Sequence, residues 1–114
     1  MLNRESSMAM HVVDAKTLKQ WLERDEAVLV DVRECAEHAE ARIAPAMHVP
    51  LATLSRETLP AFAGKKLVLH CAAGVRSARG CERLLTEWPE LEVYSLEGGI
   101  QAWAGMGYPV DCGA

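Results

Sequence analysis

The sequence predicts an α/β protein in which one layer of β-sheet lies between two layers of helix. Short β-branched runs alternate with amphipathic stretches along the chain, which is typical of βα units built over a parallel sheet. Two runs, AVLVD at 27–31 and KLVLHC at 66–71, are apolar almost throughout. Such runs are expected of central strands that helices cover on both faces.

The first elements follow from local signals. Residues 11–13 form a short first strand, and Asp14 is a candidate N-cap for a helix that carries Leu18, Trp21 and Leu22 on one face. The strand at 27–31 follows that helix. We expect a short polar helix at 35–41 next.

The middle of the chain contributes a third strand at 46–49, which Pro50 closes. One or two helical turns precede Gly64, and the strand at 66–71 is the clearest of all. We expect it to be followed by a helix from about 77 to 87.

The last elements begin after Pro89, because proline cannot continue a helix. A fifth strand at 91–96 follows, and the residues EGGIQAW at 97–103 open a final short helix.

The length of 114 residues is enough for one compact domain and too small for two ordinary ones. We expect a single domain over residues 10–112. Residues 1–9 contain one arginine and no continuous apolar run, so they are interpreted as a flexible lead rather than a secretory signal.

Composition excludes several classes of function. Half the residues are hydrophobic, a quarter are charged and the net charge is -4, which indicates a soluble globular protein without the basic face that nucleic acid requires. No apolar run approaches the roughly 20 residues needed to cross a bilayer. We therefore expect neither a nucleic-acid nor a membrane partner.

The four cysteines, Cys35, Cys71, Cys81 and Cys112, form no CxxC pair. A disulfide framework or a zinc site normally has more closely paired ligands, and the histidines show no metal spacing either. Reduced thiols in a cytoplasmic protein, with no metal and no cofactor, are the simplest interpretation.

The residues HCAAGVRS at 70–77 carry the strongest chemical signal. Cys71 ends a buried parallel strand and a helix follows almost at once, which places it where α/β sheets bind ligands. A tight glycine-containing turn that enters a helix directs several backbone N–H groups at one point, where negative charge is stabilised. These donors and Arg76 would lower the pKa of the thiol and favour the reactive thiolate.

The simpler alternative is that Cys71 is a buried apolar thiol beside a turn. The order of strand, cysteine, small residues, glycine, arginine and helix favours the nucleophile. His70 is interpreted as the end of the strand rather than a general base, and Cys81 as a helix-packing residue. Cys35 is the better candidate for a second thiol, although a bystander role is favoured for it too.

Four segments together resemble the rhodanese homology family over nearly the whole chain. They are VLVDVRE at 28–34, EHAEARIAPAMHVPL at 37–51, LVLHCAAGVRSA at 67–78 and VYSLEGGIQAWAGMGYPV at 93–110. The third matches the active-loop pattern CxxGxRS. Four matches in the right order are far more specific than CxxGxR alone.

The resemblance implies a central, mainly parallel five-stranded sheet and a sulfurtransferase whose cysteine carries sulfane sulfur as a persulfide. By position that cysteine is Cys71, with Asp31 and Arg33 as supporting charges. The resemblance also implies a loop that cradles the persulfide or the substrate anion: Ala72, Ala73, Gly74, Val75, Arg76 and Ser77.

The implied partners are a small sulfur-containing donor anion, such as thiosulfate, or a persulfide, and an acceptor that is cyanide, a thiol or a protein cysteine. The sequence leaves the oligomeric state open. It departs from the family at Arg42 and Pro45, where members commonly have histidine and glycine, and its loop side chains Ala72, Ala73 and Val75 carry no charge.

Two other functions remain as alternatives. One is a rhodanese-like sulfur carrier or docking module without turnover. The other is a cysteine phosphatase or arsenate reductase, whose loop places five residues between cysteine and arginine. Here four residues separate Cys71 from Arg76, which makes a smaller ring of amides and favours sulfur.

Overall fold

The computed structural model describes residues 10–113, so the predicted lead at 1–9 lies outside the described residues. Its central sheet has five strands in the order β1-β6-β5-β2-β4, and each neighbouring pair is parallel. The strands are β1 His11–Val13, β2 Ala27–Asp31, β4 Met47–His48, β5 Lys66–His70 and β6 Val93–Leu96. The predicted α/β class and parallel five-stranded sheet are confirmed.

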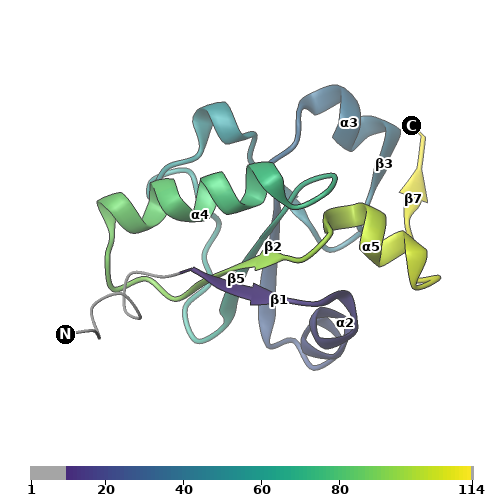
Figure 1. Ribbon diagram of the computed structural model, residues 1–114, viewed down its shortest axis with the longest axis horizontal. Helices are drawn as coiled ribbons and strands as arrows, with labels where there is room; N and C mark the ends of the chain where they lie inside the picture. Colours follow the sequence, from purple (N-terminus) through teal and green to yellow (C-terminus); the bar gives the residue numbers. More distant parts are fainter. Residues whose placement is uncertain (1–9, 114) are drawn as a thin grey trace.

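Helices cover both faces of this sheet. Figure 1 shows α4 on one side and α2 on the other, with α5 near α2. The helices are α2 Ala15–Glu23, α3 Cys35–Glu40, α4 Val75–Glu87 and α5 Gly99–Gly105, with a short 3-10 helix η1 at Leu51–Thr53. The three-layer arrangement follows from the two apolar faces of the central strands.

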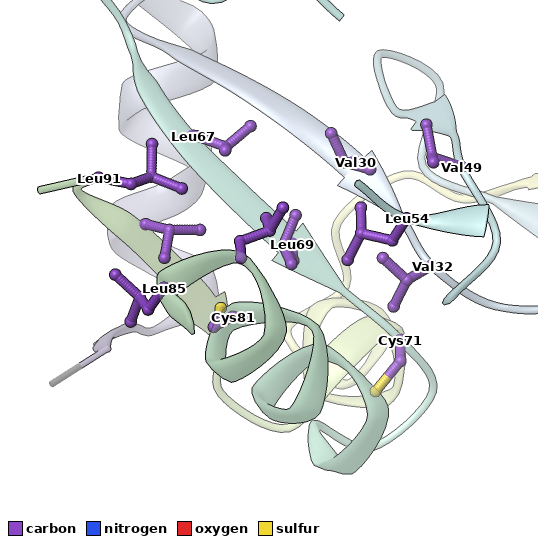
Figure 2. Packing of buried hydrophobic residues seen from close by; sticks show 12 residues of the cluster. Val30, Val32, Val49, Leu54, Leu67, Leu69, Cys71, Cys81, Leu85 and Leu91 are labelled. Carbon is purple, nitrogen blue, oxygen red and sulfur yellow. The ribbon is translucent and has the colours of Figure 1, made fainter. Parts of the chain in front are cut away.

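The alternation of side chains along β5 divides the core in two. Leu67 and Leu69 belong to the cluster under α4, which Figure 2 shows, whereas Val68 between them belongs to the cluster under α2 and α5. Successive side chains of a strand point to opposite faces. A continuously apolar strand therefore supplies both cores at once.

The predicted start of the first helix is confirmed in detail. The Asp14 side chain accepts a hydrogen bond of 2.8 Å from the backbone N–H of Thr17, which satisfies one of the free donors of the first helical turn. At the far end of α4, Trp88 leaves helical geometry one residue before Pro89, as the residue preceding a proline tends to do.

Several strands and helical turns are shorter in the structure than the sequence predicted. The third strand narrows from 46–49 to β4 at Met47–His48, the fifth begins at Val93 rather than 91, and the helical turns before Gly64 reduce to η1. The backbone N–H of Val49 still donates to Asp31 O at 2.9 Å. The chain beyond β4 thus keeps one backbone hydrogen bond to β2 without being part of the regular strand pairing.

One feature of the fold was missed entirely. Residues Ala41–Arg42 form β3, which pairs antiparallel with β7 at Asp111–Cys112. The prediction had ended the preceding helix at Ala41 and placed Cys112 in a tail. Strands of two residues are too short to leave a periodic pattern, so only the approach of distant segments creates them.

None of the helices within residues 10–113 is long and apolar enough to cross a membrane.

Candidate active site

The loop between β5 and α4 lies at the carboxyl end of a central strand. Cys71 immediately follows β5 and is 1% exposed. Gly74 takes a left-handed conformation with φ of 106° and serves as the N-cap of α4, a geometry that favours glycine because it has no Cβ. The chain therefore turns from strand to helix within three residues of Cys71.

The helix begins two residues earlier than predicted. α4 starts at Val75 rather than about Ser77, so Arg76 and Ser77 belong to its first turn and not to the loop. The reason is Gly74, whose left-handed geometry completes the turn. The backbone N–H groups of the first helical turn are free of partners within the helix, and here they lie next to the thiol.

Hydrogen-bond donors surround the sulfur of Cys71. The backbone N–H groups of Gly74 and Ser77 donate to Cys71 Sγ at 3.1 and 3.3 Å. Ser77 Oγ lies 3.6 Å from the same sulfur and 2.7 Å from Ser95 Oγ on β6. In the thiol form, Cys71 Sγ can donate to Ser77 Oγ, and the Ser77 hydroxyl donates to Gly74 O at 3.3 Å. A thiolate sulfur can only accept, so on ionisation the Ser77 hydroxyl can turn to donate to the sulfur and accept from Ser95.

These contacts decide the protonation of Cys71. Burial is the largest single influence and by itself raises the pKa of the thiol, but the hydrogen bonds from Ser77 and Gly74 together outweigh it. The pKa of Cys71 consequently lies below its ordinary value. A thiolate is both the nucleophile and the better leaving group in sulfur chemistry.

The first turn of α5 donates backbone hydrogen bonds to the loop that contains Cys71. The backbone N–H of Ile100 donates to Cys71 O at 2.9 Å, and that of Gln101 donates to Ala72 O at 3.1 Å. Gly99 has a φ of +59°, and a Cβ there would come within 2.5 Å of Ala72 O. These contacts hold the carbonyl groups of Cys71 and Ala72 against α5.

Arg76 is anchored to α3. Its Nη1 and Nη2 donate to the two carboxylate oxygens of Glu37 at 2.7 and 2.9 Å. The hydrogen bond from Arg76 lowers the pKa of Glu37 to about 2, and the same pair raises the pKa of Arg76. This pair links the first turn of α4, next to Cys71, to α3.

Asp31 and Arg33 form a buried ion pair at the end of β2. Arg33 Nε and Nη2 donate to the Asp31 carboxylate at 3.0 and 2.8 Å, and the exposed fractions of the two residues are 5% and 0%. His38 Nδ1 lies 2.8 Å from Asp31 Oδ2. Although burial raises the pKa of Asp31, the hydrogen bonds from Arg33 and His38 bring it below its ordinary range.

His70 connects this cluster to the loop without touching the thiol. Its Nδ1 lies 3.2 Å from Cys71 O, and its Nε2 lies 3.8 Å from Asp31 Oδ2 with no hydrogen-bond partner among residues 10–113. Burial lowers the pKa of His70, which favours the neutral ring. This geometry agrees with the prediction that His70 is a structural residue at the end of the strand and not a general base for Cys71.

The other cysteines differ from Cys71. All four thiols are free; Cys35 and Cys112 are exposed, whereas Cys81 is buried in the core under α4. Burial raises the pKa of Cys81 to about 12. No cluster of three or more histidine, cysteine, aspartate or glutamate residues suited to a metal ion occurs within residues 10–113.

Sequence reasoning missed four residues that shape the site: Glu37, His38, Ser95 and Gly99. Glu37 accepts from the backbone N–H of Glu34 at 2.9 Å in a capping box at the start of α3, but Glu34 stands where the sequence signature of a capping box has serine or threonine. Of the other three, Gly99 belongs to the glycine pair in the family-like segment at 93–110, whereas His38 and Ser95 have no sequence signal. These three reach the loop and the Asp31 pair from α3, β6 and α5 through the tertiary fold.

Comparisons with known proteins agree on one family. Residues 14–106 match the family model described as Rhodanese-like domain. The chain is 38% identical over 94 residues to an uncharacterized protein of Synechocystis, a match that covers 82% of this chain and 52% of that protein. The chain thus spans about half the length of that relative.

A second relative has a named activity. The chain is 32% identical over 88 residues to the thiosulfate sulfurtransferase GlpE of Coxiella burnetii, covering 75% of this chain and 81% of that protein. Among solved structures, the rhodanese-related protein of Thermoplasma volcanium superposes with a TM-score of 0.74 at 33% identity, covering 89% of this chain and 97% of that one. The architecture described above is shared with that structure.

Proposed function

Because the chain belongs to the rhodanese-like domain family, we propose that it is a sulfurtransferase that moves sulfane sulfur through a persulfide on Cys71. The observation that carries the proposal is the pair of backbone N–H groups, from Gly74 and Ser77, that donate to Cys71 Sγ, with the Ser77 hydroxyl 3.6 Å from the same sulfur. These donors favour a thiolate. They also provide hydrogen bonds for a second, negatively charged sulfur bound to it.

The reaction has two halves, as covalent catalysis does. The Cys71 thiolate attacks the outer sulfur of a donor such as thiosulfate or a persulfide; an S–S bond forms to Cys71 while the donor's own bond to that sulfur breaks. Sulfite or a thiolate leaves with the electron pair. An acceptor such as cyanide, a small thiol or a protein cysteine then attacks the outer sulfur and releases the Cys71 thiolate.

Neither half requires a strong general base, because the nucleophile is already deprotonated and the leaving groups are stabilised anions. This agrees with the position of His70, which contacts the carbonyl oxygen of Cys71 and not its sulfur. The chemistry also needs no cofactor or metal from the protein. We expect the reaction to take place in the cytoplasm, where thiols stay reduced.

Mass spectrometry of the intact protein tests the proposal. After incubation with thiosulfate or an organic persulfide, wild type is expected to gain one sulfur atom, and Cys71→Ser is expected to gain none. Cys81→Ser serves as the matched control and should still gain the atom. An adduct of equal size on Cys71→Ser, or none on wild type with either donor, would contradict the proposal.

The same experiment separates turnover from carriage. A catalyst returns to its starting mass when cyanide or a thiol is added and produces thiocyanate or the acceptor's persulfide many times per site. A sulfur carrier accepts one atom and releases it only to a dedicated protein. Continuous thiocyanate production with kinetics first order in the protein identifies the enzyme.

Phosphoryl or arsenate chemistry is disfavoured by the state of Arg76. Binding an anion with several oxygens requires a guanidinium with free N–H donors. The guanidinium of Arg76 instead donates through two nitrogens to Glu37. Release of phosphate from an aryl phosphate, with no uptake of sulfur, would support this alternative instead.

A further inference from the structure

Both arginines predicted for the site have their charge neutralised by a carboxylate. The Arg76 guanidinium binds both oxygens of Glu37, and the Arg33 guanidinium binds both oxygens of Asp31. A paired guanidinium presents little net charge to a second anion. The positive potential near Cys71 therefore comes mainly from backbone N–H dipoles, which suit one small negative centre.

The surface beside the loop is apolar. Val75 is 65% exposed and Val12 is 56% exposed. These are two of the four large hydrophobic side chains that are exposed within residues 10–113, and both line one hollow of about 360 Å³ together with Met10, Ala73 and Ala78. Single exposed apolar residues are ordinary, but two that share one hollow with Ala73 and Gly74 of the Cys71 loop indicate a binding surface.

The charge that lines this hollow is negative. Glu97 is exposed and is the charged residue among those that line it. A dianion such as thiosulfate would lose hydration on approach and meet a carboxylate instead of a free cation. An apolar group would gain about 25 cal/mol for each Å² of apolar surface removed from water.

We propose that the site selects sulfane-sulfur donors that carry an apolar substituent and at most one negative charge, with Glu37 and Val75 as residues that set this preference. The inference rests on the proposed sulfurtransferase activity. Organic persulfides and thiosulfonates belong to this class. With a thiosulfonate, R–SO₂–S⁻, the Cys71 thiolate takes the outer sulfur and becomes a persulfide anion, while the sulfinate R–SO₂⁻ leaves with the electron pair.

Three donors test the preference with cyanide as a common acceptor. Thiosulfate is a dianion without a substituent, methanethiosulfonate is a monoanion with a methyl group, and benzenethiosulfonate is a monoanion with an aromatic ring. We measure kcat/KM for thiocyanate formation, divided by the rate constant of the uncatalysed reaction of each donor with cyanide. We expect this corrected kcat/KM to be highest for benzenethiosulfonate, lower for methanethiosulfonate and lowest for thiosulfate.

Replacing Glu37 isolates the charge effect. Glu37→Gln keeps an amide that can cap α3 but leaves the charge of Arg76 uncompensated. The expected result is a rise of about fivefold in kcat/KM for thiosulfate relative to methanethiosulfonate, which shrinks with added salt. Glu40→Gln, an equal change of net charge on an exposed residue of α3, should leave the ratio unchanged.

Replacing Val75 isolates the apolar effect. Val75→Thr keeps the shape of the side chain and adds a hydroxyl, so we expect the preference for benzenethiosulfonate over methanethiosulfonate to fall about three- to fivefold. Met106→Gln changes another exposed apolar residue, which is 51% exposed at the end of α5, and should leave the preference intact.

The outcomes separate this inference from the proposed function. If no donor yields a persulfide on Cys71, the sulfurtransferase proposal itself fails. If all three react but the corrected value for thiosulfate equals or exceeds those of the thiosulfonates, only the selectivity is wrong. An equal loss for all donors in Glu37→Gln would also overturn the inference, because Glu37 would then only position the loop. Arg79 is an exposed residue of α4, and a loss specific to thiosulfate in Arg79→Ala would overturn the inference too, because Arg79 would then supply a cation for that donor.

Discussion

Cys71 and Cys81 lie ten residues apart and share one hydrophobic cluster (Figure 2), yet their thiols have opposite properties. Both are at most 1% exposed. The pKa of Cys81 is raised to about 12, chiefly by burial, whereas the pKa of Cys71 is lowered despite burial. The difference lies in the polar groups around each sulfur.

Two N–H groups and one hydroxyl surround the sulfur of Cys71, while Cys81 lies within α4, where backbone N–H groups are used by the helix itself. Burial excludes water from both thiols and penalises the charged form of each. Only the thiol at the start of the helix receives replacement hydrogen bonds. The reactivity of these two thiols therefore depends on whether free N–H groups at the start of α4 reach the sulfur, and not on how deeply the sulfur is buried.

The largest expected difference between the two thiols is in alkylation by iodoacetamide at pH 7. With a pKa of about 12, Cys81 has roughly one thiolate in 100,000 molecules. Cys71 should react at least about a thousandfold faster, since its pKa lies below the ordinary value. The measurement is peptide mapping in a Cys35→Ser, Cys112→Ser background, and comparable rates at the two sites would refute the comparison.

The support of the Cys71 loop by α5 is tested next. Gly99→Ala combines a positive φ with a Cβ that collides with the loop carbonyls, so we expect sulfur transfer to fall at least about tenfold and stability to drop by about 2 kcal/mol or more. Gly64→Ala is the matched control: φ there is +81°, but nothing lies within 4 Å of the added Cβ. It should cost about 1 kcal/mol without a specific loss of transfer.

A smaller effect is expected from the hydroxyl at the start of α4. Ser77→Ala removes a hydrogen bond that stabilises the Cys71 thiolate, so the pKa of Cys71 should rise. We expect the midpoint of its alkylation rate against pH to move to higher pH. Thr86→Ala, which removes a hydroxyl from the far end of the same helix, should not move it.

The smallest effect concerns the brace between α3 and the first turn of α4. Hydrogen bonding from Arg76 lowers the pKa of Glu37 from 4.5 to about 2, so the stabilisation by this pair is complete above pH 4.5 and is lost as the pH falls toward 2. Glu37→Gln should therefore show a flatter loss of stability than wild type over this window, measured by urea unfolding. The difference should be modest, because the pair is about one-third exposed. An identical pH profile for the two proteins would show that the brace contributes nothing.

Much of the fold could be predicted because continuously apolar strands and amphipathic helices leave local signals in the sequence. The strands containing Leu29 and Val68, and the N-cap at Asp14, follow from local residue types. The two-residue strands at 41–42 and 111–112 could not be predicted, since they exist only where distant segments meet. The start of α4 was misplaced by two residues because the conformation of Gly74 is not encoded by its identity alone.

Residue types and their order along the chain were enough to predict the α/β architecture, the place of Cys71 between a strand and a helix, and the resemblance to rhodanese-like proteins. The sequence could not determine what Arg76 does, because its partner Glu37 lies 39 residues away on another helix. Nor could it assign Ser95 and Gly99 to the Cys71 loop. Hydrogen bonding and charge neutralisation depend on distances of about 3 Å, and only tertiary packing sets such distances between residues remote in the chain.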